Sequence, residues 1–103
     1  MAAAPQSRDA TFDKITAKGL RIVNDAGKRQ AFLRTVKAGA ALGIYNTAGK
    51  AQAVLEAKED GGGLDIYNKT YEQGVQIYAD DNGNGYVGAF NRKGKGRTLK
   101  PGN

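Results

Sequence analysis

The sequence lacks three residue types on which much of protein chemistry depends. Its 103 residues include no cysteine, no histidine and no tryptophan. Without cysteine, a disulfide scaffold and a thiolate metal site are excluded. Without histidine, the commonest general base and zinc ligand is missing. These absences exclude many enzyme mechanisms, and we predict that the protein is not an enzyme.

Bulky apolar residues are also few. Eight aromatic residues and two prolines stand against fifteen glycines. No apolar run approaches the roughly 18 residues of a membrane helix, so we predict no transmembrane segment. Because each part of the chain has little bulky surface to bury, its stability must come from many small contacts.

One short segment occurs four times in the sequence. Its copies end in asparagines that lie 22, 22 and 23 residues apart, at Asn24, Asn46, Asn68 and Asn91. In three copies Gly-Lys follows three and four residues later, whereas the third copy ends its turn differently. A fixed period of this length is typical of a repeat protein in which each unit stacks on its neighbours.

The repeats predict an all-β fold. Apolar and variable positions alternate in each copy, and a period of two indicates a strand. The motif Asn-x-x-Gly-Lys suits a type I turn followed by a left-handed glycine and a bulge, and further turns are expected at residues 37–39, 59–62 and 80–83. Four repeats of about 22 residues then give roughly eight short strands, as an antiparallel β-meander or a narrow β-solenoid. We favour the meander because the turn chemistry is specific to hairpins.

The repeats also suggest domain limits. We expect a single β-repeat domain at residues 14–100, after a flexible lead-in at 1–13 and before a short tail at 101–103. Within the lead-in, residues 1–5 lack the apolar core of an intact signal peptide, although the alanines at 2–4 are compatible with what remains after cleavage of one.

The meander raises the question of how its faces are covered. Pairing Asn24 with Lys28 across the first turn places Leu20, Ile22 and Phe32 on one face. It places Val23, Ala31 and Leu33 on the other. Both faces are then partly apolar, which predicts a curled sheet or several chains packed sheet on sheet, with a homotrimeric β-prism as a natural closed form. In a solenoid, Leu20, Ile22, Ala31 and Leu33 point inward instead.

In the third repeat the residue at the left-handed position of the turn is Tyr71 rather than glycine. The turn must therefore change its type or strain a residue that is not glycine. Such a change marks either a functional interruption or ordinary decay of the repeat, and we favour decay.

The net charge of +6 is unevenly distributed. Residues 1–37 hold eight basic and three acidic side chains, residues 38–90 three and seven, and residues 91–103 five and none. The basic C-terminal cluster consists of Arg92, Lys93, Lys95, Arg97 and Lys100. It is either a docking site for an anionic surface or a solvated end that limits further stacking. Nucleic acid is not an expected partner, because no motif interleaves aromatic and basic residues.

One segment carries oxygen ligands in a pattern known from calcium loops. Asp80, Asn82 and Asn84 alternate and Gly85 follows. The bidentate glutamate that would close such a loop is replaced by Asn91. Because Asp, Asn and Gly are also the standard turn residues, we favour a plain turn over a calcium site and predict no cofactor.

Five acidic residues could in principle supply a pair of catalytic carboxylates. The candidates are Glu56, Glu59, Asp60, Asp65 and Glu72. Placed on exposed turns, these carboxylates stay solvated and cannot reach the raised pKa of a general acid. We therefore predict no catalytic residue.

Three aromatic residues recur one repeat apart, at Tyr45, Tyr67 and Phe90, with Val23 at the start of the series. They predict a ladder along one face of the sheet. The ladder is either a platform for sugar rings or an apolar partner, or it is cross-strand packing at an interface between chains.

Residues 14–99 resemble bacterial β-repeat proteins that carry Leu-x-Ile-Tyr-Asn-x-x-Gly-Lys, then an apolar strand and an Asp-Gly-Gly-rich turn. The lead-in at 12–18 also resembles the entry to such arrays. The resemblance implies a surface or secreted structural module, in an extracellular, cell-surface or virion setting, and it transfers no functional residues. By architecture alone, the chain is also similar to the trimeric β-prism shafts of phage spikes and fibres.

Two functions follow as expectations. The first is a non-enzymatic structural module, a stalk, spike or surface scaffold, that acts as a homo-oligomer. The second is a binding module that uses the aromatic ladder or the basic C-terminal cluster to contact a glycan, an anionic surface or a protein.

Overall fold

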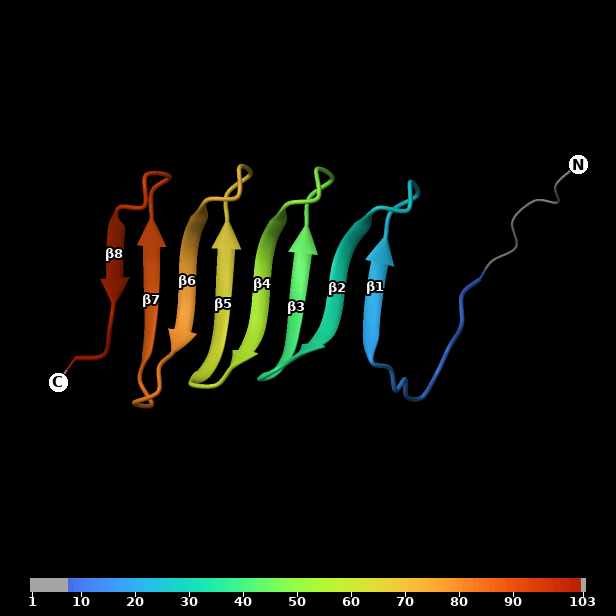
Figure 1. Cartoon of the computed structure of the whole chain (residues 1–103), viewed down its shortest axis with the longest axis horizontal. Helices are drawn as coiled ribbons and strands as arrows, with labels where there is room; N and C mark the ends of the chain where they lie inside the picture. The colour runs from blue at the N-terminus through green and yellow to red at the C-terminus, as the bar shows by residue number, and fades with distance from the viewer. Residues whose placement is uncertain (1–7, 103) are drawn as a thin grey trace, which may run out of the picture.

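The computed structural model describes residues 8–102, which form one antiparallel sheet of eight strands in the order of the sequence (Figure 1). The strands are β1 (Gly19–Val23), β2 (Arg29–Val36), β3 (Gly39–Tyr45), β4 (Ala51–Lys58), β5 (Gly61–Tyr67), β6 (Gln73–Ala79), β7 (Gly85–Phe90) and β8 (Gly96–Leu99). The predicted all-β meander is confirmed, and the chain does not coil into a solenoid. The described residues contain no helix long and apolar enough to cross a membrane.

The sheet begins at Gly19, after a segment at 8–18 that contributes no strand. Its last strand ends at Leu99. The alanines at 2–4, considered above as a remnant of a signal peptide, lie outside the described residues, as does most of the lead-in at 1–13.

Four turns that start with the repeated asparagines, at residues 24–28, 46–50, 68–72 and 91–95, lie along one edge of the sheet, which we call the Asn-turn edge (Figure 1). In the first, the amide of Gly27 donates to the carbonyl of Asn24 and the amide of Asn24 donates to the carbonyl of Lys28, both at 2.9 Å. The side-chain oxygen of Asn24 accepts the amides of Ala26 and Lys28. Gly27 has a φ of 79°. The predicted turn with a left-handed glycine is confirmed.

The third turn keeps this geometry without glycine. The amide of Tyr71 donates to the carbonyl of Asn68 at 3.0 Å, and Tyr71 has a φ of 70°. Of the two predicted alternatives, the turn therefore strains a residue that is not glycine rather than changing its type.

The other edge of the sheet, the opposite edge, carries shorter connections. Residues 37–38 and 59–60 each join two strands, because Val36 pairs with Gly39 and Lys58 with Gly61. The third connection, residues 80–84, is a turn of the asparagine type, in which the amide of Asp80 donates to the carbonyl of Asn84 at 2.7 Å. Between equivalent pairs, Ala57 with Gly62 and Ala79 with Gly85, this connection is one residue longer, which accounts for the spacing of 23 between the last two repeats.

The predicted division of side chains between the faces is wrong. Leu20 pairs with Leu33 and Ile22 with Ala31, so these four residues share one face, whereas Phe32 lies on the other. The pairing shifts between Ile22 and Val23 because β2 contains an additional residue there. One extra residue moves every later side chain to the opposite face.

The sheet is a single layer without an enclosed core. Among the described residues, the buried hydrophobic residue is a small one, Ala41, with 6% of its surface exposed, and no large side chain is fully buried. The antiparallel hydrogen bonds hold the strands together, but within residues 8–102 no second layer covers either face. Any functional surface of this protein is therefore a face or an edge of the sheet.

Candidate functional site

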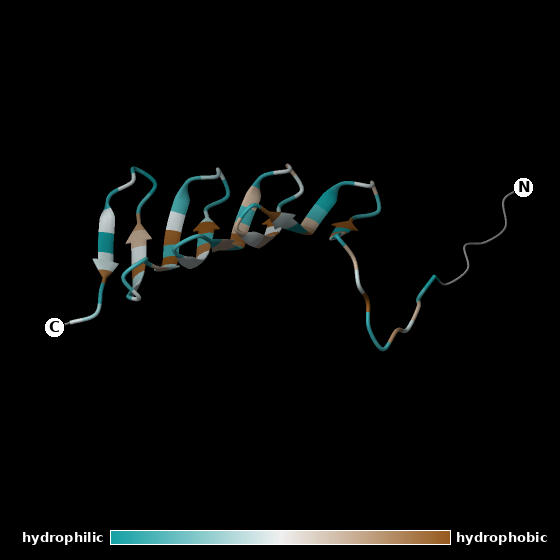
Figure 2. Ribbon diagram, turned by 60° about the horizontal axis from the view of Figure 1, so that its bottom comes forward, coloured by the Kyte–Doolittle hydropathy of each residue, from teal (hydrophilic) through white to brown (hydrophobic). Residues whose placement is uncertain are grey.

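The face that carries Leu20, which we call the aliphatic face, presents one row of large apolar side chains across all eight strands. Its members, each paired with the next, are Leu20, Leu33, Leu42, Leu55, Leu64, Ile77, Val87 and Leu99. A second row beside it contains Ile22, Ala31, Ile44, Ala53, Ile66, Val75 and Ala89. In Figure 2 the corresponding hydrophobic bands recur from strand to strand, while the turns are mostly hydrophilic.

Most of the large side chains in these rows are exposed to solvent, whereas Leu42, Leu64 and Val75 are half-buried. Leu20 exposes 55% of its surface, Leu55 53% and Ile77 44%, although all three lie in regular strands. Soluble monomers rarely expose a continuous apolar patch of this extent, and such patches mark interaction sites. The aliphatic face is therefore the leading candidate for a functional surface.

The other face, which we call the polar face, packs aromatic rings over glycines. A side chain added to Gly43 would meet the phenol of Tyr45 at 2.6 Å, and one added to Gly88 would meet the ring of Phe90 at 2.7 Å. Gly63 lies under the ring of Tyr78 in the same way. The predicted ladder of Tyr45, Tyr67 and Phe90 lies on this face, opposite the aliphatic rows, and its rings are half-buried against their own sheet.

Cations cover some of these rings. The guanidinium of Arg29 lies 4.2 Å from the ring centre of Tyr45 and 5.5 Å from that of Phe32. The ammonium of Lys58 lies 4.0 Å from the ring centre of Tyr78. Such contacts stabilise the rings in place by the attraction of a cation to the π face.

The third repeat departs from this packing, because Asp65 stands where Gly43 and Gly88 stand in other repeats. The ring of Tyr67 instead stacks on Tyr71, with 4.7 Å between ring centres. Asp65 exposes only 6% of its surface. Its carboxylate accepts hydrogen bonds from the side-chain amide of Gln73 and, at 2.5 Å, from the hydroxyl of Tyr78.

The environment of these residues shifts the pKa values of two tyrosines and a glutamate. Burial of the phenol, together with its hydrogen bond to Asp65, raises the pKa of Tyr78 well above its ordinary value. Burial, and then the charge of Asp65, also raises the pKa of Tyr67. On the adjacent turn, hydrogen bonds from Thr70 and Asn68 lower the pKa of Glu72.

The expectation that all five candidate acids lie on exposed turns is wrong for Glu56 and Asp65. Glu56 lies half-buried in β4. Asp65 lies in the middle of β5, and both of its hydrogen-bond donors belong to β6. The sequence carried a partial signal, because Asp65 stands where the second and fourth repeats have Gly43 and Gly88 and the first has Arg21. Among residues 8–102, no group of three or more acidic side chains is arranged to hold a metal ion.

The segment considered for calcium forms the predicted turn. One carboxylate oxygen of Asp80 accepts the backbone amides of Asn82 and Asn84, at 3.0 and 2.8 Å. Asp80 thus caps this turn as the repeated asparagines cap theirs.

The basic C-terminal cluster is spread over three places. Arg92, Lys93 and Lys95 lie on the last turn of the Asn-turn edge. Arg97 pairs with Ala89 at the border of the aliphatic face, because the last hairpin has no additional residue, and Lys100 follows the end of β8. The cluster is therefore not a single patch.

Sequence comparison adds no relative to this picture. Searched against protein-family models and against curated proteins, the chain matches none.

Proposed function

We propose that this protein is a non-enzymatic structural module, a stalk, spike or surface scaffold, whose copies associate by packing their aliphatic faces together. The observation that carries the proposal is the row of leucine, isoleucine and valine side chains, most of them exposed, that continues across β1 to β8. A face of this kind is stable in water once a second apolar face covers it.

The size of the aliphatic face suits an interface between copies. Its six inner strands each contribute three positions and its two outer strands two, and each position occupies roughly 30 Å² of a sheet. The flat area is then roughly 700 Å² per chain, close to the roughly 800 Å² that each partner contributes to a stable interface of standard size. Sheets packed face to face lie about 10 Å apart, a distance that leucine and isoleucine side chains fill.

The polar face supports a structural rather than a catalytic role. Its buried carboxylate, Asp65, is engaged by Gln73 and Tyr78, and its rings lie over glycines or over each other. These groups satisfy one another. The chain also has no histidine or cysteine to act on a substrate.

Light scattering coupled to size exclusion tests the proposal. We expect the wild-type protein to have a mass that is a multiple of 10.9 kDa, two or three copies being the closed forms that cover every aliphatic face. Leu55→Lys, which places a charge in the middle of that face, should shift the mass to one chain.

The matched control is Val54→Lys. Val54 is the neighbour of Leu55 in β4, lies on the polar face and pairs with Asp65, so a lysine there should leave the oligomer intact. A wild-type protein that stays monomeric at all concentrations tested would overturn the proposal.

A second candidate function is binding of an anionic glycan. A groove of about 630 Å³ on the polar face is lined by Gln76, Tyr86, Thr98 and Lys100, and also by Asp80. Lys100 is the member of the basic C-terminal cluster that lines it. A ring and a cation together suit a charged sugar. Titration with a sulfated oligosaccharide, followed by NMR, should shift the resonances of Tyr86 in the wild type and less in Lys100→Ala; unchanged spectra would dismiss this function.

A further inference from the structure

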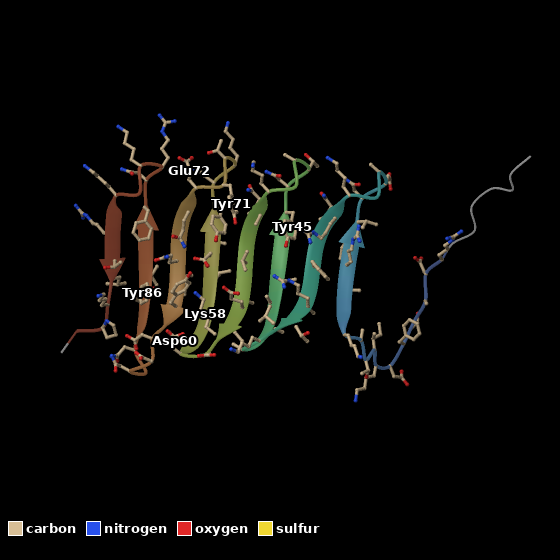
Figure 3. All side chains as sticks on the ribbon, viewed as in Figure 1. Tyr45, Lys58, Asp60, Tyr71, Glu72 and Tyr86 are labelled. Atoms are coloured by element: carbon tan, nitrogen blue, oxygen red, sulfur yellow. The ribbon has the colours of Figure 1, made fainter. Side chains whose placement is uncertain are left out.

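The two turn edges of the sheet carry charge of opposite sign. The Asn-turn edge has two acidic residues, Asp25 and Glu72, and six basic ones: Lys28, Lys50, Lys69, Arg92, Lys93 and Lys95. The connections of the opposite edge have one basic residue, Lys37, and four acidic ones: Glu59, Asp60, Asp80 and Asp81. Lys18 and Lys100 flank this edge at the two ends of the sheet. Figure 3 shows Glu72 and Asp60 at the two opposite edges.

These charges do not meet within one chain. Inside residues 8–102, the structure forms an ion pair between Lys58 and Glu56, and no ion pair joins the charged groups of the two turn edges. The strands separate the edges: β4, for example, has eight residues, which span roughly 25 Å. Each edge is therefore free to attract the other edge of a neighbouring copy.

Copies that share their aliphatic faces can be related by two kinds of rotation axis. An axis along the strands sets β1 of one copy beside β8 of the next, and like turn edges then lie together. An axis across the strands, along the direction in which the repeats follow one another, sets the Asn-turn edge of one copy beside the opposite edge of the next.

Charge distinguishes the two arrangements. The first sets like turn edges together, the basic Asn-turn edge against its copy and the acidic opposite edge against its copy. The second brings the basic Asn-turn edge against the acidic opposite edge. Like charges across an interface suppress an arrangement, and complementary ones favour it.

We infer that copies of this protein are related by an axis that runs along the array of repeats, so that the Asn-turn edge of each copy contacts the opposite edge of the next. The inference rests on the proposed self-association and names its geometry. It applies equally to a dimer and to a trimer, since both place the Asn-turn edge of one copy in contact with the opposite edge of the next.

Individual strands illustrate the match. Lys50 precedes β4 and Glu59 follows it, so where β4 of one copy lies beside β4 of the next, a lysine faces a glutamate. Asp60 and Lys69 flank β5 in the same way. Three strands are exceptions and carry like charges at both ends: β2 with Lys28 and Lys37, β6 with Glu72 and Asp80, and β8 with Lys95 and Lys100. At β2, the ammonium of Lys28 donates to the carbonyl of Thr47 in the adjacent turn. The match is therefore carried by β4, β5 and the summed charge of each edge.

Thiol cross-linking tests the geometry, and no native cysteine competes with the introduced ones. In the double variant Lys50→Cys/Glu59→Cys, the two thiols lie at opposite ends of β4, roughly 25 Å apart within one chain. A bismaleimide with a spacer of about 10 Å, the separation of packed sheets, should therefore link separate chains into covalent dimers or closed rings, seen on a denaturing gel.

The control double variant is Lys28→Cys/Lys95→Cys, in the first and the last turn of the Asn-turn edge. These turns lie six strands apart, roughly 29 Å, and meet only if the axis runs along the strands. Links in the control, or in neither variant while the wild-type protein is oligomeric, overturn the inference but leave self-association standing. A monomeric wild type overturns both.

A charge swap provides an independent readout. Lys50→Glu should raise the dissociation constant of the oligomer roughly 2- to 5-fold per contact, the range of a single exposed ion pair. Lys50→Glu/Glu59→Lys should restore it, because the pair is reversed and not removed. A double variant that binds no better than Lys50→Glu would contradict the contact.

Discussion

At the level of single residues, two departures in the third repeat are coupled. Asp65 occupies the site at which glycine lies under an aromatic ring in the second and fourth repeats, and the ring of Tyr67 stacks on Tyr71 instead. Tyr71 in turn sits at the left-handed position of its turn, where other repeats have glycine. A strained backbone thus accompanies a ring contact that glycine could not make.

We predict that the stack offsets the strain. Tyr71→Ala should destabilise the protein, because it keeps a left-handed residue that is not glycine and loses a contact worth about 0.5–1.5 kcal/mol. Tyr71→Gly should be more stable than Tyr71→Ala by about 1–2 kcal/mol, the cost of that backbone conformation. Urea unfolding of the three proteins measures both differences. Equal stabilities of the alanine and glycine variants would contradict the strain.

The raised pKa of Tyr78 predicts sensitivity to alkali. A phenol whose pKa is higher in the folded state stabilises the fold fully below the unfolded value, about 10, and this contribution is lost as pH rises above it. The wild type should therefore lose stability above that pH more steeply than Tyr78→Phe. Unfolding curves at several pH values compare them, and parallel pH profiles would argue against the shift.

At the level of elements, turns could be read from the sequence but register could not. Asn24, Gly27 and their counterparts predict hairpins because local chemistry determines these turns. The additional residue in β2 has no such local signature, since Gln30, Gln52 and Gly74 stand at the equivalent position. Without it, the two faces were wrongly divided.

The candidate surface was hidden for the same reason. Assigning Phe32 to the face of Leu20 makes both faces partly apolar, so the continuous aliphatic rows cannot be recognised from the sequence. The buried position of Asp65 was also missed, because burial on the polar face depends on Tyr78 and Gln73 from the neighbouring strand. Contacts between strands cannot be inferred until the register is known.

Packing on the polar face predicts a difference between two glycines. Gly43→Ala should destabilise the protein by about 1–3 kcal/mol, because its new methyl group displaces the ring of Tyr45 from beneath Arg29. Gly74→Ala should have little effect, since Gln30 and Gln52 show that the equivalent position accepts a side chain. Thermal unfolding compares the two, and equal losses would speak against the ring packing.

At the level of the whole molecule, the stability of the sheet depends on what covers it. A layer without an enclosed core gains little from burial, so folding and association should be linked. We predict that the melting temperature of the wild type rises with protein concentration, and that this dependence disappears in Leu55→Lys. A melting temperature independent of concentration would show that the single layer is stable alone.

The additional residue in alternate strands has a consequence for the length of the molecule. Because of it, equivalent residues of successive 22-residue units lie on the same face of the sheet, as Leu20, Leu42 and Leu64 do. A duplicated unit would lengthen the sheet by two strand spacings, about 10 Å, and would leave both faces unchanged. The number of units would then act as a ruler, setting length independently of surface chemistry.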